Sequence, residues 1–80
     1  MYWQAYSSRG GAKGYIEDYQ GAIEDFNKAI RINPSDDKSY YGRGLAKIVL
    51  NQKESGCSDL QRALKLGNPQ AKETILKYCH

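Results

Sequence analysis

Apolar residues recur three and four positions apart between residues 19 and 30, the spacing that places them on one face of an α-helix. Asp18 precedes them and can accept hydrogen bonds from the free N–H groups of a helix start. Asn33-Pro34 follows them, and proline pushes the residue before it out of helical geometry. The pattern therefore predicts an amphipathic helix between Asp18 and Pro34, with an apolar face made of Tyr19, Ala22, Ile23, Phe26, Ala29 and Ile30.

The chain repeats itself at an offset of 34 residues, where residues 5–32 align with residues 39–66 without a gap. A helix is expected before each copy of the amphipathic one, at about residues 3–16 and 37–50, so each unit forms a helix hairpin. A period of this length indicates a stacked repeat architecture. The identical pairs are Tyr6/Tyr40, Arg9/Arg43, Gly10/Gly44, Ala12/Ala46, Lys13/Lys47, Asp25/Asp59 and Ala29/Ala63.

The period and the order of small and aromatic residues resemble the tetratricopeptide repeat. The first unit matches the family pattern at Tyr6, Gly10, Ala22, Phe26, Ala29 and Pro34, and the second at Tyr40, Gly44, Leu60 and Ala63. The resemblance implies an all-α fold, a right-handed superhelix of helix hairpins with about five helices. The whole chain, residues 1–80, would be one domain, with repeat one at about 3–36 and repeat two at about 37–68.

The last segment, "NPQAKETILKYCH" (68–80), predicts a closing helix at about 69–79. Asn68 is expected to cap it, and Pro69 suits the first helical position. Ala71, Ile75, Leu76 and Tyr78 give it an apolar side. It resembles the helix that covers the last hairpin of such arrays.

The glycine-rich segment "RGGAKG" (9–14) lacks the preceding strand and the lysine-serine or lysine-threonine pair of a phosphate-binding loop. Gly10, like Gly44, is expected to let the second helix of its hairpin approach closely. Gly11 and Gly14 align instead with Leu45 and Ile48. They should weaken the first helix by about 1 kcal/mol each relative to alanine.

Composition is typical of a globular chain: 80 residues, 40% hydrophobic, with a net charge of +3. No apolar run approaches the ~20 residues needed to cross a membrane, no secretory signal is visible, and the compartment stays open. Metal ligands at characteristic spacings are absent, and His80 is the only histidine, so we expect no metal, no cofactor and no enzymatic activity. The acidic residues Glu17, Asp18, Glu24, Asp25, Asp36 and Asp37 are expected at helix caps or on the outer helical face.

Four basic residues, Arg9, Lys13, Arg43 and Lys47, stand where the family usually has leucine and an aromatic residue. Their stems can cover apolar surface while their charges reach water, or the charges can pair within the chain. The alternative is nucleic-acid binding through this ladder, with Tyr6, Tyr40 and Tyr41 stacking on bases. The small net charge and the interspersed acidic residues count against that alternative.

The resemblance implies a protein-binding module with a concave face formed by the first helix of each hairpin. In this sequence that face would include Ser7, Gly11, Tyr15, Lys38, Tyr41, Leu45 and Ile48, with Gly14, Gly42 and Val49 beside them. Chaperone-binding members of the family hold a terminal carboxylate with lysines and asparagines, but Ser7, Gly11 and Gly42 stand at those places here. A segment with hydrophobic side chains is therefore the expected ligand. Alternatively, neighbouring repeats of a longer chain cover the same surface.

The first unit begins with Tyr2 and Trp3 and no polar cap. Exposed aromatic ends of repeat arrays tend to associate. A homodimer through the helices of unit one is therefore predicted, with a structural fragment of a longer array as the alternative.

The two cysteines, Cys57 and Cys79, are placed near the start of one helix and the end of the antiparallel closing helix. A disulfide between them would fasten the closing helix to the array and add about 3 kcal/mol of stability. A pair of buried reduced thiols is the alternative.

Overall fold

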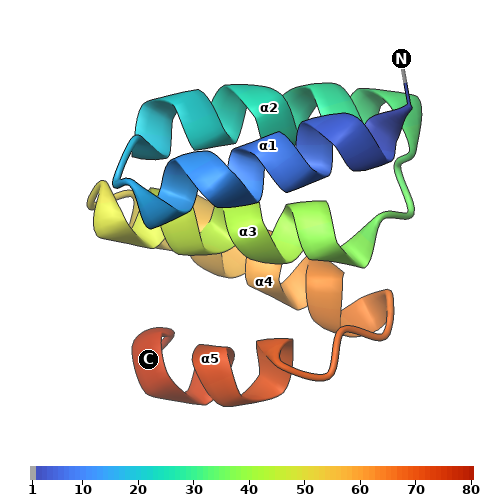
Figure 1. The fold of residues 1–80 in the computed structure, drawn as a ribbon. Coiled ribbons are helices and arrows are strands. Elements are labelled where there is room, and N and C mark those ends of the chain that lie inside the picture. The colour runs from blue at the N-terminus through green and yellow to red at the C-terminus, as the bar shows by residue number, and fades with distance from the viewer. Residues whose placement is uncertain (1) are drawn as a thin grey trace.

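The computed structural model describes residues 2–80, and these form five helices and no strand (Figure 1). The helices α1 and α2 form one hairpin and α3 and α4 a second, stacked beside it, and α5 lies along the far side of α4. The predicted all-α fold of stacked helix hairpins is confirmed. The helices are α1 (Trp3–Tyr15), α2 (Tyr19–Ile32), α3 (Asp37–Val49), α4 (Lys53–Lys65) and α5 (Ala71–Tyr78).

Helix α2 begins after Asp18 and ends before Asn33-Pro34, as the sequence predicts. The Asp18 side chain accepts a hydrogen bond of 3.0 Å from the backbone N–H of Gly21, which satisfies one free donor of the first turn. After Ile32 the chain turns to extended geometry at Asn33, ahead of Pro34. Cap and proline together fix the register of this helix, whose apolar face supplies half of the buried hydrophobic residues.

The turns inside the two hairpins repeat each other in backbone detail. Glu17 and Asn51 both adopt left-handed geometry, with φ of 64° and 66°. In each turn the next residue's N–H bonds back to the lysine carbonyl of the preceding helix, at 2.8 Å for Asp18 and 2.7 Å for Gln52. Asparagine tolerates this geometry, whereas glutamate is strained in it.

The last helix begins later than predicted. Pro69 and Gln70 form a turn, and α5 starts at Ala71. Asn68 is buried, and it accepts a hydrogen bond from the Gln70 N–H while its amide donates to the Asp37 carboxylate of α3, each at 2.9 Å. Asn68 therefore ties the turn to the neighbouring hairpin instead of capping α5.

Glycines in both hairpins allow their helices to pack closely. A Cβ atom on Gly10 would lie 2.9 Å from the ring of Phe26, and one on Gly44 would lie 2.8 Å from the carbonyl oxygen of Gly56. The Phe26 ring is wedged between Gly10 of α1 and Gly42 of α3, where an added Cβ would also overlap it. The close approach expected at Gly10 and Gly44 is confirmed.

Two side-chain contacts join α5 to the rest of the molecule. Cys57 of α4 and Cys79, just after α5, form a disulfide with an Sγ–Sγ distance of 2.10 Å. The Tyr41 hydroxyl of α3 lies 3.0 Å from the Thr74 hydroxyl of α5. Because α5 has only eight residues and cannot hold itself in helical form, these contacts and its apolar side keep it in place.

Candidate binding groove

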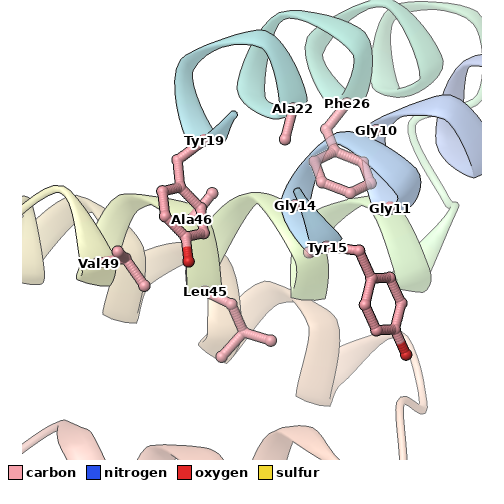
Figure 2. Close-up of a pocket in the computed structure, with 11 residues that line it drawn as sticks. Gly10, Gly11, Gly14, Tyr15, Tyr19, Ala22, Phe26, Leu45, Ala46 and Val49 are labelled. Atoms are coloured by element: carbon pink, nitrogen blue, oxygen red, sulfur yellow. The ribbon is translucent and has the colours of Figure 1, made fainter. Parts of the chain in front are cut away.

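An apolar groove with a volume of about 280 Å³ opens between α1 and α3, with α2 as its floor (Figure 2). No lining residue carries a charge, and the polar side-chain groups are the hydroxyls of two tyrosines. Apolar concave surfaces with few polar groups are the usual form of ligand sites in proteins. The lining residues are Gly10, Gly11, Gly14, Tyr15, Tyr19, Ala22, Phe26, Gly42, Leu45, Ala46 and Val49.

The groove exists because Gly11 and Gly14 of α1 carry no side chain on this side. A Cβ added to Gly11 or Gly14 would meet no atom within 4 Å. The floor below them is closed by Ala22, Phe26 and Ala46, all of which are buried. The two glycines that weaken α1 therefore also create the open space.

Larger side chains surround the mouth of the groove. Tyr15 is 93% exposed at the end of α1 and Val49 is 56% exposed at the end of α3. Figure 2 shows Tyr15 extending outward on one side, with Leu45 and Val49 along α3 and the Tyr19 ring reaching from α2 toward α3. These apolar surfaces face water, so covering them would be favourable.

The structure separates the predicted contact residues into distinct places. Gly11, Tyr15 and Leu45 line the groove, and Leu45 also lines the hollow beside α5. Ser7 and Lys38 line a different hollow near Trp3, where α1 and α3 begin, and Tyr41 lies in a hollow beside α5.

Ile48 does not lie in the groove. Its side chain packs toward α4, where the absence of a Cβ on Gly56 makes room for it. The predicted face therefore includes one residue that belongs to the interface between α3 and α4.

Tyr19 and Phe26 belong to the groove but were assigned only to the core face of α2. The sequence held a partial indication for Tyr19. This residue aligns with the polar Lys53 in unit two, so the position is not part of the core that the two units share. The angle at which α2 crosses α1 and α3 decides which apolar residues of α2 face the opening. The spacing of apolar residues along the sequence does not predict that angle.

Two basic residues of α1 and two of α3 are paired with buried carboxylates of the helices behind them. Arg9 donates two hydrogen bonds to Asp25, at 2.9 and 2.8 Å, and Lys13 lies 3.1 Å from the same carboxylate. Arg43 and Lys47 hold Asp59 in the same way, at 2.8, 2.7 and 3.0 Å.

The prediction that Asp25 lies on the outer helical face is wrong, since it is only 1% exposed. Hydrogen bonds from Arg9, opposed by burial and supported by Lys13, lower the pKa of Asp25 from 3.8 to about 2. The hydrogen bonds to Asp59 raise the pKa of Arg43. The charges of these basic side chains are therefore paired within the chain, which is one of the arrangements expected from the sequence.

Within residues 2–80 no group of histidine, cysteine and acidic side chains is arranged to hold a metal ion. In the same range, every helix falls short of the length and apolar character that a membrane span requires.

Two stacked helix hairpins related by a 34-residue period, followed by a fifth helix, define a helical repeat protein. A family model described as "TPR repeat" matches residues 16–47. The chain belongs to the tetratricopeptide repeat family, whose repeats are in general non-enzymatic protein–protein interaction modules.

Known proteins with similar sequences agree with this assignment. The chain is 35% identical over 72 residues to "TPR repeat-containing thioredoxin TDX" of Arabidopsis thaliana, covering 90% of this chain and 19% of that protein. It is 32% identical over 65 residues to "Peptidyl-prolyl cis-trans isomerase FKBP4" of Homo sapiens, covering 80% and 14% respectively. It is 33% identical over 72 residues to "Heat shock protein STI1" of Saccharomyces cerevisiae, covering 88% and 12%.

The chain thus spans less than a fifth of the length of each of these relatives. No solved structure matched the chain.

Proposed function

We propose that the chain binds a hydrophobic segment of another protein in the groove between α1 and α3, without catalysis. The observation that carries this proposal is an open groove of about 280 Å³ that has no charged lining residue. It lies on three helices packed against one another, so its shape is held before a ligand arrives. Preformed grooves of this kind bind apolar side chains at a low ordering cost.

The size of the groove sets the expected strength of binding. Burying one large aliphatic side chain contributes about 1.5–3 kcal/mol, and association itself costs several kcal/mol. Two such anchors contribute about 3–6 kcal/mol in total, and the cost of association offsets much of this, so a short segment held by them alone should bind no more tightly than the millimolar range. Tighter binding would require contacts beyond the groove, such as the hollow beside Tyr41.

The test uses a phage-displayed library of random dodecapeptides selected on the intact chain. Val49→Asp places a charge on the exposed wall of the groove and should reduce binding of the selected peptides at least tenfold. Ile32→Asp is the matched control, since Ile32 is also the last residue of its helix, is 48% exposed and does not line the groove. Equal binding by both variants would remove the site from this groove.

The paired charges argue against the alternative of nucleic-acid binding. Four of the twelve basic residues are held by Asp25 and Asp59, which reduces the positive field on their face. Binding of a protein segment in an apolar groove should change little with salt, whereas nucleic-acid binding weakens steeply. Affinity for single-stranded RNA that falls by orders of magnitude between 50 and 200 mM salt would favour the alternative.

A second copy of the chain is a proposed partner at another surface, the outer edge of α1. In unit two the equivalent edge is buried at Ser39 and Ala46, whereas the counterparts of these residues in α1, Ala5 and Ala12, are exposed. Small exposed residues allow two α1 helices to approach closely. Sedimentation velocity should show a concentration-dependent dimer that Ala12→Arg weakens, and a monomer at every concentration would contradict the proposal.

A further inference from the structure

We propose that the ligand in the groove is an amphipathic helix that places two branched aliphatic side chains, one helical turn apart, over Gly11 and Gly14. This inference rests on the proposed function and specifies its ligand. Its evidence is the comparison of the two repeats within the same chain.

Unit two shows which side chains belong over these positions. The 34-residue period aligns Gly11 with Leu45 and Gly14 with Ile48. Helix α3 thus carries two branched aliphatic residues where α1 carries none. Since a Cβ at either glycine would meet nothing within 4 Å, the corresponding space on α1 is open.

The neighbouring helices do not fill this space from behind. In unit two Ile48 packs onto Gly56 of α4. In unit one the equivalent pair is Gly14 and Ala22, so a single methyl group replaces the larger isoleucine side chain. Unit one therefore lacks, at the groove, most of the aliphatic side-chain volume that unit two contains at the equivalent positions.

The volume and the spacing agree with two anchors on a helix. An engineered cavity of about 150 Å³ accommodates one benzene molecule, and this groove has about 280 Å³. Gly11 and Gly14 are separated by about 4.5 Å along the axis of α1, which matches residues three apart on a partner helix. Alternate residues of an extended strand are farther apart, at about 6.6 Å.

The chemistry of the lining excludes a charged anchor. The groove offers no cation to an acidic side chain and no carboxylate to a basic one. Burying an unpaired charge there would be unfavourable. The polar face of the ligand helix would instead point to solvent, beyond Tyr15 and Val49.

The experiment uses a helical peptide library with a fixed alanine, glutamate and lysine scaffold in which four positions of one face are randomised. Selection on the intact chain should enrich leucine, isoleucine, valine or methionine at two positions three or four residues apart. The best peptide should lose at least tenfold in affinity when either anchor is replaced by alanine, and also when a proline is placed between the anchors.

Variants of the protein supply the matching test. Gly11→Leu introduces the residue of unit two into the open space, and it should abolish detectable binding of the best peptide while raising the melting temperature of the chain. A loss of binding with a more stable fold cannot be attributed to unfolding. Gln61→Leu, an exposed position on α4 outside the groove, is the control and should bind normally.

Failure of this inference can be distinguished from failure of the proposed function. Suppose that the selected peptides lose affinity for the Val49→Asp variant, so that they do bind in the groove. If they carry aromatic or charged anchors, or still bind with a proline between the anchors, the proposal of a helix with aliphatic anchors is overturned while the proposed function stands. Selected peptides that bind this variant and the Gly11→Leu variant as well as the wild-type chain overturn both proposals.

Discussion

The glycines of α1 allow a prediction that separates helix propensity from packing within a single helix. Gly11 and Gly14 face open space, whereas Gly10 contacts the ring of Phe26. We compare the three single alanine substitutions and the double variant Gly11→Ala/Gly14→Ala. The difference among them depends on what the added methyl group meets and on how far the position lies from the end of the helix.

The magnitudes follow from these surroundings. Alanine is favoured over glycine in a helix interior by about 0.8–1.0 kcal/mol, and less at Gly14, which is the next-to-last residue of α1. The double variant should therefore raise the free energy of unfolding by about 1.5 kcal/mol. For a domain of this size that corresponds to an increase in melting temperature of about 6–12 °C.

Gly10→Ala should have the opposite effect. Its methyl group would lie 2.9–3.1 Å from three atoms of the Phe26 ring, and Gly42 closes the other side of the ring. Overpacking costs about 1–3 kcal/mol, which exceeds the gain in helix propensity, so a net loss of about 1 kcal/mol is expected.

Urea denaturation followed by circular dichroism at 222 nm measures all four variants. The reasoning is refuted if Gly10→Ala stabilises the chain as much as Gly11→Ala does, because the wedged position of Phe26 would then be incorrect. A double variant no more stable than the wild-type chain would refute the claim that the groove glycines weaken α1.

Three further predictions concern other parts of the fold. Asp25, with a pKa lowered to about 2, should contribute about 2 kcal/mol of stability above pH 4 and lose it as the pH falls from 4 to 2. Urea titrations of Asp25→Asn should show that loss already at pH 7 and a weaker acid dependence, and an unchanged acid profile would contradict the ion-pair geometry. Reducing the Cys57–Cys79 disulfide, which closes a loop with a sequence separation of 22, should add two hydrogens to the mass and lower stability by about 3 kcal/mol; a chain whose mass is unaffected by reductant would show that the bond does not form. Glu17→Asn, which copies Asn51 at the equivalent left-handed position, should raise the melting temperature, and a decrease would show that the strain lies elsewhere.

Much of the fold could be predicted because its signals are local. The Asp18 cap, the Asn33-Pro34 stop and the spacing of apolar residues act within one or two helical turns, and the 34-residue period indicated how the hairpins stack. The start of α5 could not be predicted in this way. Asn68 bonds to Asp37, which lies 31 residues earlier, and this tertiary contact replaces the cap that the local sequence suggested.

The burial of Asp25 was indicated by the sequence, although the sequence analysis placed this residue on the outer face of its helix. Arg9, Lys13 and Asp25 recur together in unit two at the same separations, which is typical of groups that contact one another. Helical periodicity alone assigns an aspartate to the outer face, because it takes no account of a cation on the neighbouring helix. Pairing across helices overcame the cost of burying Asp25.

The binding groove could be predicted only in part. Gly11, Tyr15 and Leu45 followed from the resemblance to the tetratricopeptide repeat. The comparison with unit two singled out Gly11 and Gly14 only as positions that weaken the first helix, and the open space over them was not predicted. The contribution of Tyr19 and the turning of Ile48 toward α4 depend on side-chain sizes at helix crossings. Those sizes act through the packed structure and not through any single helix.

The most direct test of the account is a map of chemical-shift changes in the labelled chain during titration with the best helical peptide. The account predicts that the largest changes occur at the methyl groups of Val49 and at the amides of Gly11 and Gly14, with little change along α4. Changes concentrated in the hollow beside Tyr41 or on the outer face of α2, with the groove unaffected, would contradict it.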